Sequence, residues 1–307
     1  MDLLITGGCG YIGSALVPLL AADDRVGRVV VFDDLSTGSP RTLMGCVNKI
    51  EFRQGDIREY GDVESAVRGV DRIVHLAAIT GADSTHDRSE ETFETNLEGT
   101  RNVLTAASKV GVERVVLASS CNIYGRATST DIDETTDPDP INPYAETKYE
   151  AEKLLSEYVA VHDMDGTALR LSTVYGDAPG IRFNLVVNHF VFRALTDRPL
   201  TVYGDGSNWR PFIHVKDAAR AYRDAVLRPN EWSEPVYNVG AGDENYRIRD
   251  VATLISEEID TVDVTYLADE HPGPSYHVNF DSVAETGFEC NYTLREGVCE
   301  LARRFTG

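Results

Sequence analysis

Sulfur-containing side chains are scarce in this 307-residue sequence, which has three methionines and five cysteines. The cysteines are odd in number and show no C-x-x-C spacing: Cys9, Cys46, Cys121, Cys290 and Cys299. A disulfide framework and a structural zinc site are therefore both disfavoured. We expect reduced thiols and no bound metal.

Long hydrophobic runs are also missing, and none approaches the length of a transmembrane helix. The first apolar segment, Leu3–Ile5, follows Met1 so closely that a signal peptide has no room. These two absences predict a cytoplasmic protein with no membrane partner.

Positive charge is the third shortage. Lysine occurs only at positions 49, 109, 148, 153 and 216, and the formal net charge is −21. Such a chain is repelled by nucleic acid and by anionic lipid. Because an excess of carboxylates is tolerated best where salt screens it, we expect a halophilic source; an unusually acidic mesophilic enzyme is the alternative.

Glycine, in contrast, is concentrated at the start of the chain. The apolar run Leu3–Ile5 is followed by Gly7, Gly8, Gly10 and Gly13, and then by a helical pattern of apolar residues. A strand, a glycine turn and a helix in this order are typical of a dinucleotide site, where the helix N-terminus faces the pyrophosphate. An ordinary glycine-rich turn is the alternative.

Strand and helix patterns alternate through the first half of the chain. Expected strands are 28–33, 51–57, 72–78, 114–120 and 167–172, and expected helices are 62–68, 91–110 and 143–162. This alternation predicts an α/β fold with a doubly wound parallel (Rossmann) sheet.

Beyond Gly176 the pattern changes to helices and loops with glycine-proline punctuation. We expect an NAD-binding domain over 1–175 and a smaller, mixed substrate-binding lobe over 176–307. The lobe is interleaved with the sheet, because short strands at 211–215 and 235–240 can return to the first domain. The acidic, proline-rich stretch 128–140 is expected to be a loop.

Asp33 ends the second expected strand, twenty residues after Gly13. A carboxylate in this place accepts hydrogen bonds from the adenosine ribose and repels a 2′-phosphate. The cofactor is therefore predicted to be NAD and not NADP.

Tyr144 and Lys148 are four residues apart on an expected helix, so both project from one face. A nearby ammonium and the nicotinamide ring of NAD⁺ are plausible sources of a lower phenol pKa. Ser120, at the end of the neighbouring strand, can bond the same substrate oxygen. The three side chains predict proton transfer in alcohol–carbonyl interconversion beside a hydride carrier.

Taken together, these motifs resemble the extended short-chain dehydrogenase/reductases, in particular the NAD-dependent epimerase/dehydratase family that acts on nucleotide sugars. The resemblance runs through Gly7–Gly13, Asp33–Gly38, Gly55–Ile57, His75–Ala78, Asn96–Thr100, Ser119–Gly125, Tyr144–Lys148, Arg210–Val215 and Tyr237–Gly240. It implies Tyr144 as the base, Lys148 as its partner on the cofactor ribose, and Ser120 on the reacting hydroxyl.

The resemblance also implies a set of residues that contact the cofactor. They are Gly7, Gly10, Tyr11, Ile12, Asp33, Asp34, Leu35, Ser36, Gly38, Asp56, Ile57, Leu76, Ala77, Ala78, Thr80, Asn96, Tyr144, Lys148 and Ser172. Substrate contacts are expected from Ser120, Thr173, Asn184, Arg210 and His271. The helices near 92–108 and 144–162 resemble those of a homodimer interface.

Four positions depart from the family pattern. Cys121 and Asn122 stand where the dehydratases have acids, which disfavours a 4,6-dehydratase. Thr173 replaces an asparagine found in many epimerases. His271 stands where an arginine usually grips a phosphate, and an imidazole is a weaker phosphate ligand than a bidentate guanidinium.

The function best predicted by these residues is nucleotide-sugar epimerisation through transient oxidation at C4. Two alternatives stay open: a sugar or small-alcohol dehydrogenase that releases NADH, and a non-catalytic NAD-binding scaffold. The intact set of Ser120, Tyr144 and Lys148 disfavours the scaffold.

Overall fold

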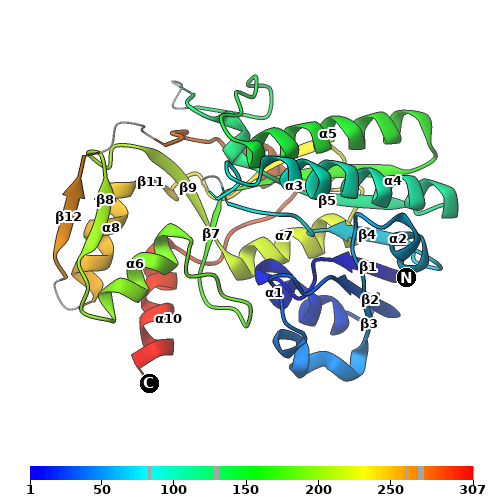
Figure 1. Cartoon of the computed structure of the whole chain (residues 1–307), viewed down its shortest axis with the longest axis horizontal. Helices are drawn as coiled ribbons and strands as arrows, with labels where there is room; N and C mark the ends of the chain where they lie inside the picture. The colour runs from blue at the N-terminus through cyan, green and yellow to red at the C-terminus, as the bar shows by residue number, and fades with distance from the viewer. Residues whose placement is uncertain (82–83, 128–130, 260–261, 269–272, 307) are drawn as a thin grey trace.

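The computed structural model describes residues 1–81, 84–127, 131–259, 262–268 and 273–306, which form a large parallel sheet beside a smaller lobe (Figure 1). The strands of the large sheet are β1 (Asp2–Thr6), β2 (Arg28–Asp33), β3 (Ile50–Gln54), β4 (Arg72–His75), β5 (Arg114–Ser120), β6 (Asp165–Leu171) and β10 (Val236–Val239). They pair in the order β10-β6-β5-β4-β1-β2-β3, and every pairing is parallel. This order confirms the predicted Rossmann sheet, in which ligands bind beyond the carboxyl ends of the strands.

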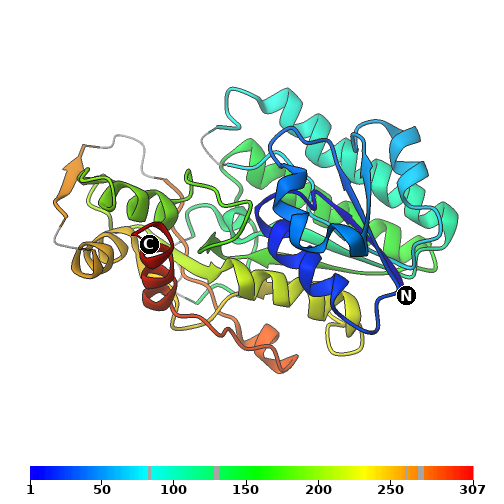
Figure 2. The ribbon, with the colours of Figure 1, turned by 90° about the horizontal axis from the view of Figure 1, so that it is seen from below.

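Helices cover both faces of this sheet (Figures 1 and 2). One apolar cluster joins the sheet to α1 (Tyr11–Ala21) and α7 (Val215–Leu227). A second joins the other face to α2 (Tyr60–Ala66), α4 (Gly99–Val110) and α5 (Pro143–Val161). Strands with continuous apolar runs, such as β2, are buried on both faces for this reason.

The helix expected over 91–110 is three consecutive segments. These are α3 (Ser89–Phe93), a π-helical stretch (Glu94–Glu98) and α4. A π-helical stretch inside a helix often marks a functional position. Here it contains Asn96, whose side chain faces inward.

The smaller lobe has a core of its own, built from two small sheets and three helices. Its elements are β7 (Thr173–Tyr175), β8 (Leu200–Tyr203), β9 (Trp209–His214), β11 (Asn245–Arg247), β12 (Val264–Leu267), α6 (Val186–Ala194), α8 (Ile248–Glu258) and α10 (Leu294–Thr306). β9 lies between β11 and β7, so the segment expected at 211–215 does not enter the large sheet. The chain instead returns through α7 and β10, and a short helix, α9 (Asp281–Glu285), follows later.

No helix of the described residues is long and apolar enough to cross a bilayer. α4 and α5 lie side by side on the outer face of the sheet (Figure 1), and a homodimer through them stays a prediction.

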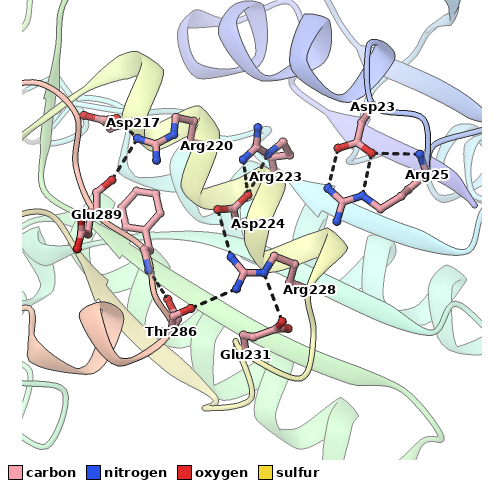
Figure 3. Close-up of polar contacts among 11 residues, drawn as sticks. Asp23, Arg25, Asp217, Arg220, Arg223, Asp224, Arg228, Glu231, Thr286 and Glu289 are labelled. Atoms are coloured by element: carbon pink, nitrogen blue, oxygen red, sulfur yellow. Dashed lines mark hydrogen bonds and ion pairs between the residues drawn. The ribbon is translucent and has the colours of Figure 1, made fainter.

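Charged side chains line α7 where it meets α1 and the C-terminal segment (Figure 3). Arg223 bonds Asp224 at 2.7 Å, and Arg220 bonds Asp217 at 2.6 Å. Asp217 is fully buried and also accepts the backbone N–H groups of Asn291 and Tyr292. Exposed ion pairs stabilise little. Asp217 differs because one of its oxygens binds Arg220 and the other binds the backbone just before α10, which holds that segment against α7.

We expect the melting temperature to rise with KCl. The net charge of −21 opposes the compact state, and the screening length falls from about 10 Å at 0.1 M to about 3 Å at 1 M salt. A rise of about 5 °C or more is expected, measured by differential scanning calorimetry. Sucrose at equal osmolality is the control, because it does not screen charge. An unchanged or lower melting temperature in KCl would contradict the halophilic interpretation.

Candidate active site

The turn between β1 and α1 is packed backbone against backbone. Gly7 has a φ of +68°, and a Cβ atom there would lie 2.7 Å from the nitrogen of Ala77. A Cβ at Gly13 would lie 2.5 Å from the carbonyl oxygen of Gly8. Both glycines are therefore required by the close approach of the turn to β4 and to the first turn of α1.

The N-terminus of α1 is left without a capping side chain. The residue at the N-cap position is Gly10, which has no side chain to cap the helix, and the first turn contains no acidic residue. Since the first N–H groups of a helix have no partner within it, their partial positive charge is open to a bound anion. The residues at this turn fit the pyrophosphate of a dinucleotide.

Asp33 links β2 to the glycine turn. Its carboxylate accepts the backbone N–H of Cys9 and that of Leu35, both at 2.9 Å. Burial raises the pKa of Asp33, and these two bonds oppose the rise. Each carboxylate oxygen keeps a further acceptor position, so the side chain can still accept from a ribose.

The rest of the expected adenosine region lies at the ends of β2 and β3. Asp34 accepts the backbone N–H of Ser36 at 2.9 Å, and a Cβ at Gly38 would meet the backbone of Cys9. Asp56 is bonded by Arg58 at 2.6 Å. The remaining predicted residues of this region are Leu35, which has a φ of +64°, and Ile57, which is buried.

After β4 the chain leaves the sheet earlier than predicted, at His75 and not at Ala78. The backbone N–H groups of Leu76 and Ala77 bond the carbonyl and hydroxyl oxygens of Thr6, which carries this segment beneath Gly7. His75 bonds the hydroxyls of Thr6 and Thr100, and burial lowers its pKa to about 3. A neutral imidazole therefore joins β1, β4 and α4.

Asn96 clamps the backbone that follows Ala78. Its amide accepts the N–H of Ile79 at 2.7 Å, donates to the carbonyl of Ile79 at 2.9 Å, and donates to Thr147 on α5 at 3.0 Å. The predicted cofactor position Asn96 thus connects the loop after β4 to the helix of Tyr144. Asn96 therefore fixes the position of the loop after β4, which forms one side of the site.

The packing of α5 on β5 brings Tyr144 and Lys148 close to the strand that ends at Ser120. The hydroxyl of Ser120 lies near that of Tyr144, where it opposes a rise in the phenol pKa. Lys148 donates to the carbonyl of Ala118 at 2.8 Å, and its Nζ lies 5.8 Å from the centre of the Tyr144 ring. Asn142 caps α5 by accepting the N–H of Ala145. This cap fixes the position of Tyr144 in the first turn of the helix.

Exclusion from water raises the pKa of Tyr144, and the hydroxyl of Ser120 and the charge of Arg182 oppose that rise. Burial lowers the pKa of Lys148 to about 8, which the charge of Glu152 opposes. A lower phenol pKa caused by Lys148 and by NAD⁺ stays a prediction for the state with cofactor. The sequence did not indicate Arg182 as a cation near Tyr144.

Behind these residues lies a buried ion pair. Arg170 on β6 bonds Glu152 on α5 at 2.7 Å, and Glu152 also accepts the hydroxyl of Ser119. Arg170 donates further to the hydroxyl of Tyr124 at 2.8 Å. This network locks α5 against β5 and β6, so that Tyr144 and Ser120 keep their relative positions.

The predicted substrate residues differ in their surroundings and are not gathered by one common contact among the described residues. Thr173 begins β7, and the exposed Asn184 accepts from Arg182 at 3.3 Å. Arg210 stacks on Tyr276 at 4.9 Å and donates to the carbonyl of Pro274. His271 lies outside the described residues. Ser172, predicted at the cofactor, uses its hydroxyl on the carbonyl of Val239 at 2.9 Å, which holds β6 to β10.

Sequence reasoning missed Tyr276, which is buried beside Asn122 and Arg210. Burial raises its pKa to about 12, while Arg210 and the bond with Asn122 oppose the rise. Asn122 also accepts the amide of Asn142 at 2.9 Å. Nothing in the local pattern around Tyr276 indicated this contact, because the segment reaches the site from the far lobe.

Comparison with known proteins places this site in a family. A model described as the NAD-dependent epimerase/dehydratase family matches residues 3–240. The chain belongs to this family. It is 31% identical over 303 residues to the low-salt glycan biosynthesis protein Agl12 of Haloferax volcanii, covering 97% of this chain and 96% of that protein. This confirms the predicted family.

Two solved structures are similar over the whole chain. The UDP-glucose 4-epimerase of Thermus thermophilus in complex with NAD is 29% identical with a TM-score of 0.87, covering 100% of this chain and 99% of that chain. The dTDP-glucose 4,6-dehydratase DesIV of Streptomyces venezuelae with NAD bound is 27% identical with a TM-score of 0.87, covering 100% and 97%. The family is NAD-dependent, and the cofactor of this protein is NAD, as predicted.

Lys148 provides a pH-dependent test of this site. Its folded pKa of about 8 lies below its ordinary value of 10.5, so between these values the folded protein binds fewer protons than the unfolded chain. Stability from this group therefore rises with pH in that window and is constant below it. The unfolding free energy of wild type minus that of Lys148→Met should rise by roughly 2 kcal/mol between pH 7.5 and 9.5.

Urea unfolding of NAD-stripped protein at several pH values measures this difference. Lys153→Met is the matched control, because Lys153 is exposed on the same helix and pairs with Glu150. Its curve should run parallel to that of wild type. Parallel curves for Lys148→Met as well would show that Lys148 is not desolvated.

Proposed function

We propose that this protein is an NAD-dependent nucleotide-sugar 4-epimerase. The observation that carries the proposal is the contact between Ser120 and Tyr144, beside Lys148 and the glycine turn. A phenol and a serine hydroxyl that lie near each other can both bond one sugar hydroxyl, and the phenol can exchange a proton with it. The glycine turn and the uncapped end of α1 are suited to hold the cofactor next to that hydroxyl.

In this proposal Tyr144 removes the proton of the sugar C4 hydroxyl, and Ser120 orients the same oxygen. Lys148 keeps a positive charge beside the ring of Tyr144 and so favours the phenolate. NAD, when bound, supplies a hydride acceptor that later acts as the donor. Tyr144 then returns the proton to the oxygen of the inverted carbon, so the enzyme ends as it began.

The neighbours of Ser120 favour epimerisation over dehydration. Elimination of a hydroxyl needs an acid to protonate the leaving oxygen. Cys121 is buried with its thiol on the carbonyl of Arg170, and burial raises its pKa. The amide oxygen of Asn122 accepts a hydrogen bond from the amide of Asn142. Neither position offers a carboxylic acid, which supports the assignment to epimerisation.

The experiment is to incubate the protein separately with UDP-glucose and UDP-galactose in molar KCl and to follow both sugars by NMR. Each should convert to the same equilibrium mixture, with no lasting absorbance from NADH. NADH that builds up in proportion to substrate, without an epimer, would assign a dehydrogenase. A 4-keto-6-deoxy product would assign a dehydratase.

Tyr144→Phe should lower kcat by at least about 100-fold while the protein retains its bound NAD, because only the proton-transfer group is removed. Tyr149→Phe on the same helix is the matched control, since Tyr149 packs against Lys153. It should keep wild-type kcat. Wild-type kcat in Tyr144→Phe would remove Tyr144 from the mechanism and would require another group as the base.

A further inference from the structure

Arg182 lies at the junction of the two lobes, in the segment that leads from β7 to α6. Its guanidinium donates to the hydroxyl of Thr80 in the loop after β4, and to Asn184 at 3.3 Å. The contact with Thr80 joins the small lobe to the loop after β4, which Asn96 holds in place through Ile79. The charge of Arg182 also acts on Tyr144.

Among the residues that the structure describes, no acidic side chain pairs with Arg182. Neither of its hydrogen-bond partners is a carboxylate, and the ion pairs found among the described residues do not include it. Burial lowers the pKa of Arg182, and its electrostatic neighbours are the neutral phenols of Tyr144 and Tyr11. Arg182 is half-buried in a protein whose net charge is −21.

Two anchors hold the segment of Arg182 over the beginning of α1. The backbone N–H of Gly180 donates to Ser14 at 3.0 Å, and a Cβ at Gly180 would lie 2.8 Å from the carbonyl oxygen of Gly10. The amide of Asn188 donates both to Tyr11 at 3.1 Å and to the carbonyl of Arg182 at 3.0 Å. Arg182 is thus fixed above the helix end that carries the unpaired N–H groups.

We propose that Arg182 binds a pyrophosphate oxygen of the ligands that meet between the lobes. A guanidinium matches phosphate oxygens in geometry and charge. The contacts described above already hold Arg182 in position. The two sources of such an oxygen are NAD, whose place is the start of α1, and the diphosphate of a nucleotide sugar. The position of Arg182 over Gly10 and Ser14 favours NAD. The second source rests on the proposed function, whereas the first rests on the family's cofactor.

The test compares wild type with Arg182→Gln and Arg182→Lys. The rate at which the holoenzyme loses NAD is measured by rapid gel filtration, and the KM for UDP-glucose is measured in the epimerase assay. Removal of a charge-assisted bond should speed NAD loss by about 10- to 100-fold in Arg182→Gln, with partial recovery in Arg182→Lys. Arg193→Gln is the control, because Arg193 lies on α6 and its guanidinium donates to the carbonyl of Pro199.

Faster NAD loss with unchanged KM assigns Arg182 to the cofactor, and the reverse assigns it to the nucleotide sugar. Wild-type NAD loss together with wild-type KM would overturn the proposal, as would a change confined to the pH profile of kcat, which would make Arg182 a partner of Tyr144 alone. If wild type epimerises no nucleotide sugar, the proposed function fails. The NAD-loss arm still decides on Arg182, because it requires no turnover.

Discussion

The close approach of two backbones, at Gly7 and Ala77, is the constraint on which the rest of this structure depends. With no side chain at Gly7, the β1–α1 turn rests directly on the segment that follows β4. That contact leaves the end of α1 open and sets the direction of the loop that Asn96 then holds. Any side chain at Gly7 would push the β1–α1 turn away from the segment after β4. The shape of the site would then change although its functional side chains were all still present.

Electrostatics in this protein divides sharply between surface and interior. The surface is strongly acidic, and its exposed ion pairs contribute little individually because solvent screens them, whereas Asp217 on α7 in Figure 3 is fully buried. In the interior, a few cations are held in place by neutral or single acidic partners. Arg170 is bound by Glu152, whereas Lys148 and Arg182 rest mainly on carbonyl and hydroxyl oxygens. A site poor in buried carboxylates is suited to anionic ligands, because those ligands complete the neutralisation.

The small lobe contributes to the site chiefly through contacts with the large sheet. Tyr11 bonds the carbonyl of Gly176 at 2.5 Å, and Asn188 joins the same hydroxyl from α6. Tyr276 comes from a still later segment and closes on Asn122 at the end of β5. The proposed reacting groups therefore sit on β5 and on α5, which packs against the large sheet, while the residues suited to select the ligand arrive from elements outside it.

The sequence by itself determined the Rossmann sheet, the family, NAD, and the positions of Ser120, Tyr144 and Lys148. These depend on local spacing: an apolar run before glycines makes the turn, and four residues along a helix place two side chains on one face. The π-helical stretch at Asn96, the early end of β4, and the place of β9 outside the large sheet were decided by tertiary contacts. So were Tyr276 and Arg182, although an arginine isolated between Ile181 and Phe183 was a signal available in the sequence. Whether a charged side chain is buried, and what neutralises it, depends on segments a hundred or more residues apart, and no local pattern contains that information.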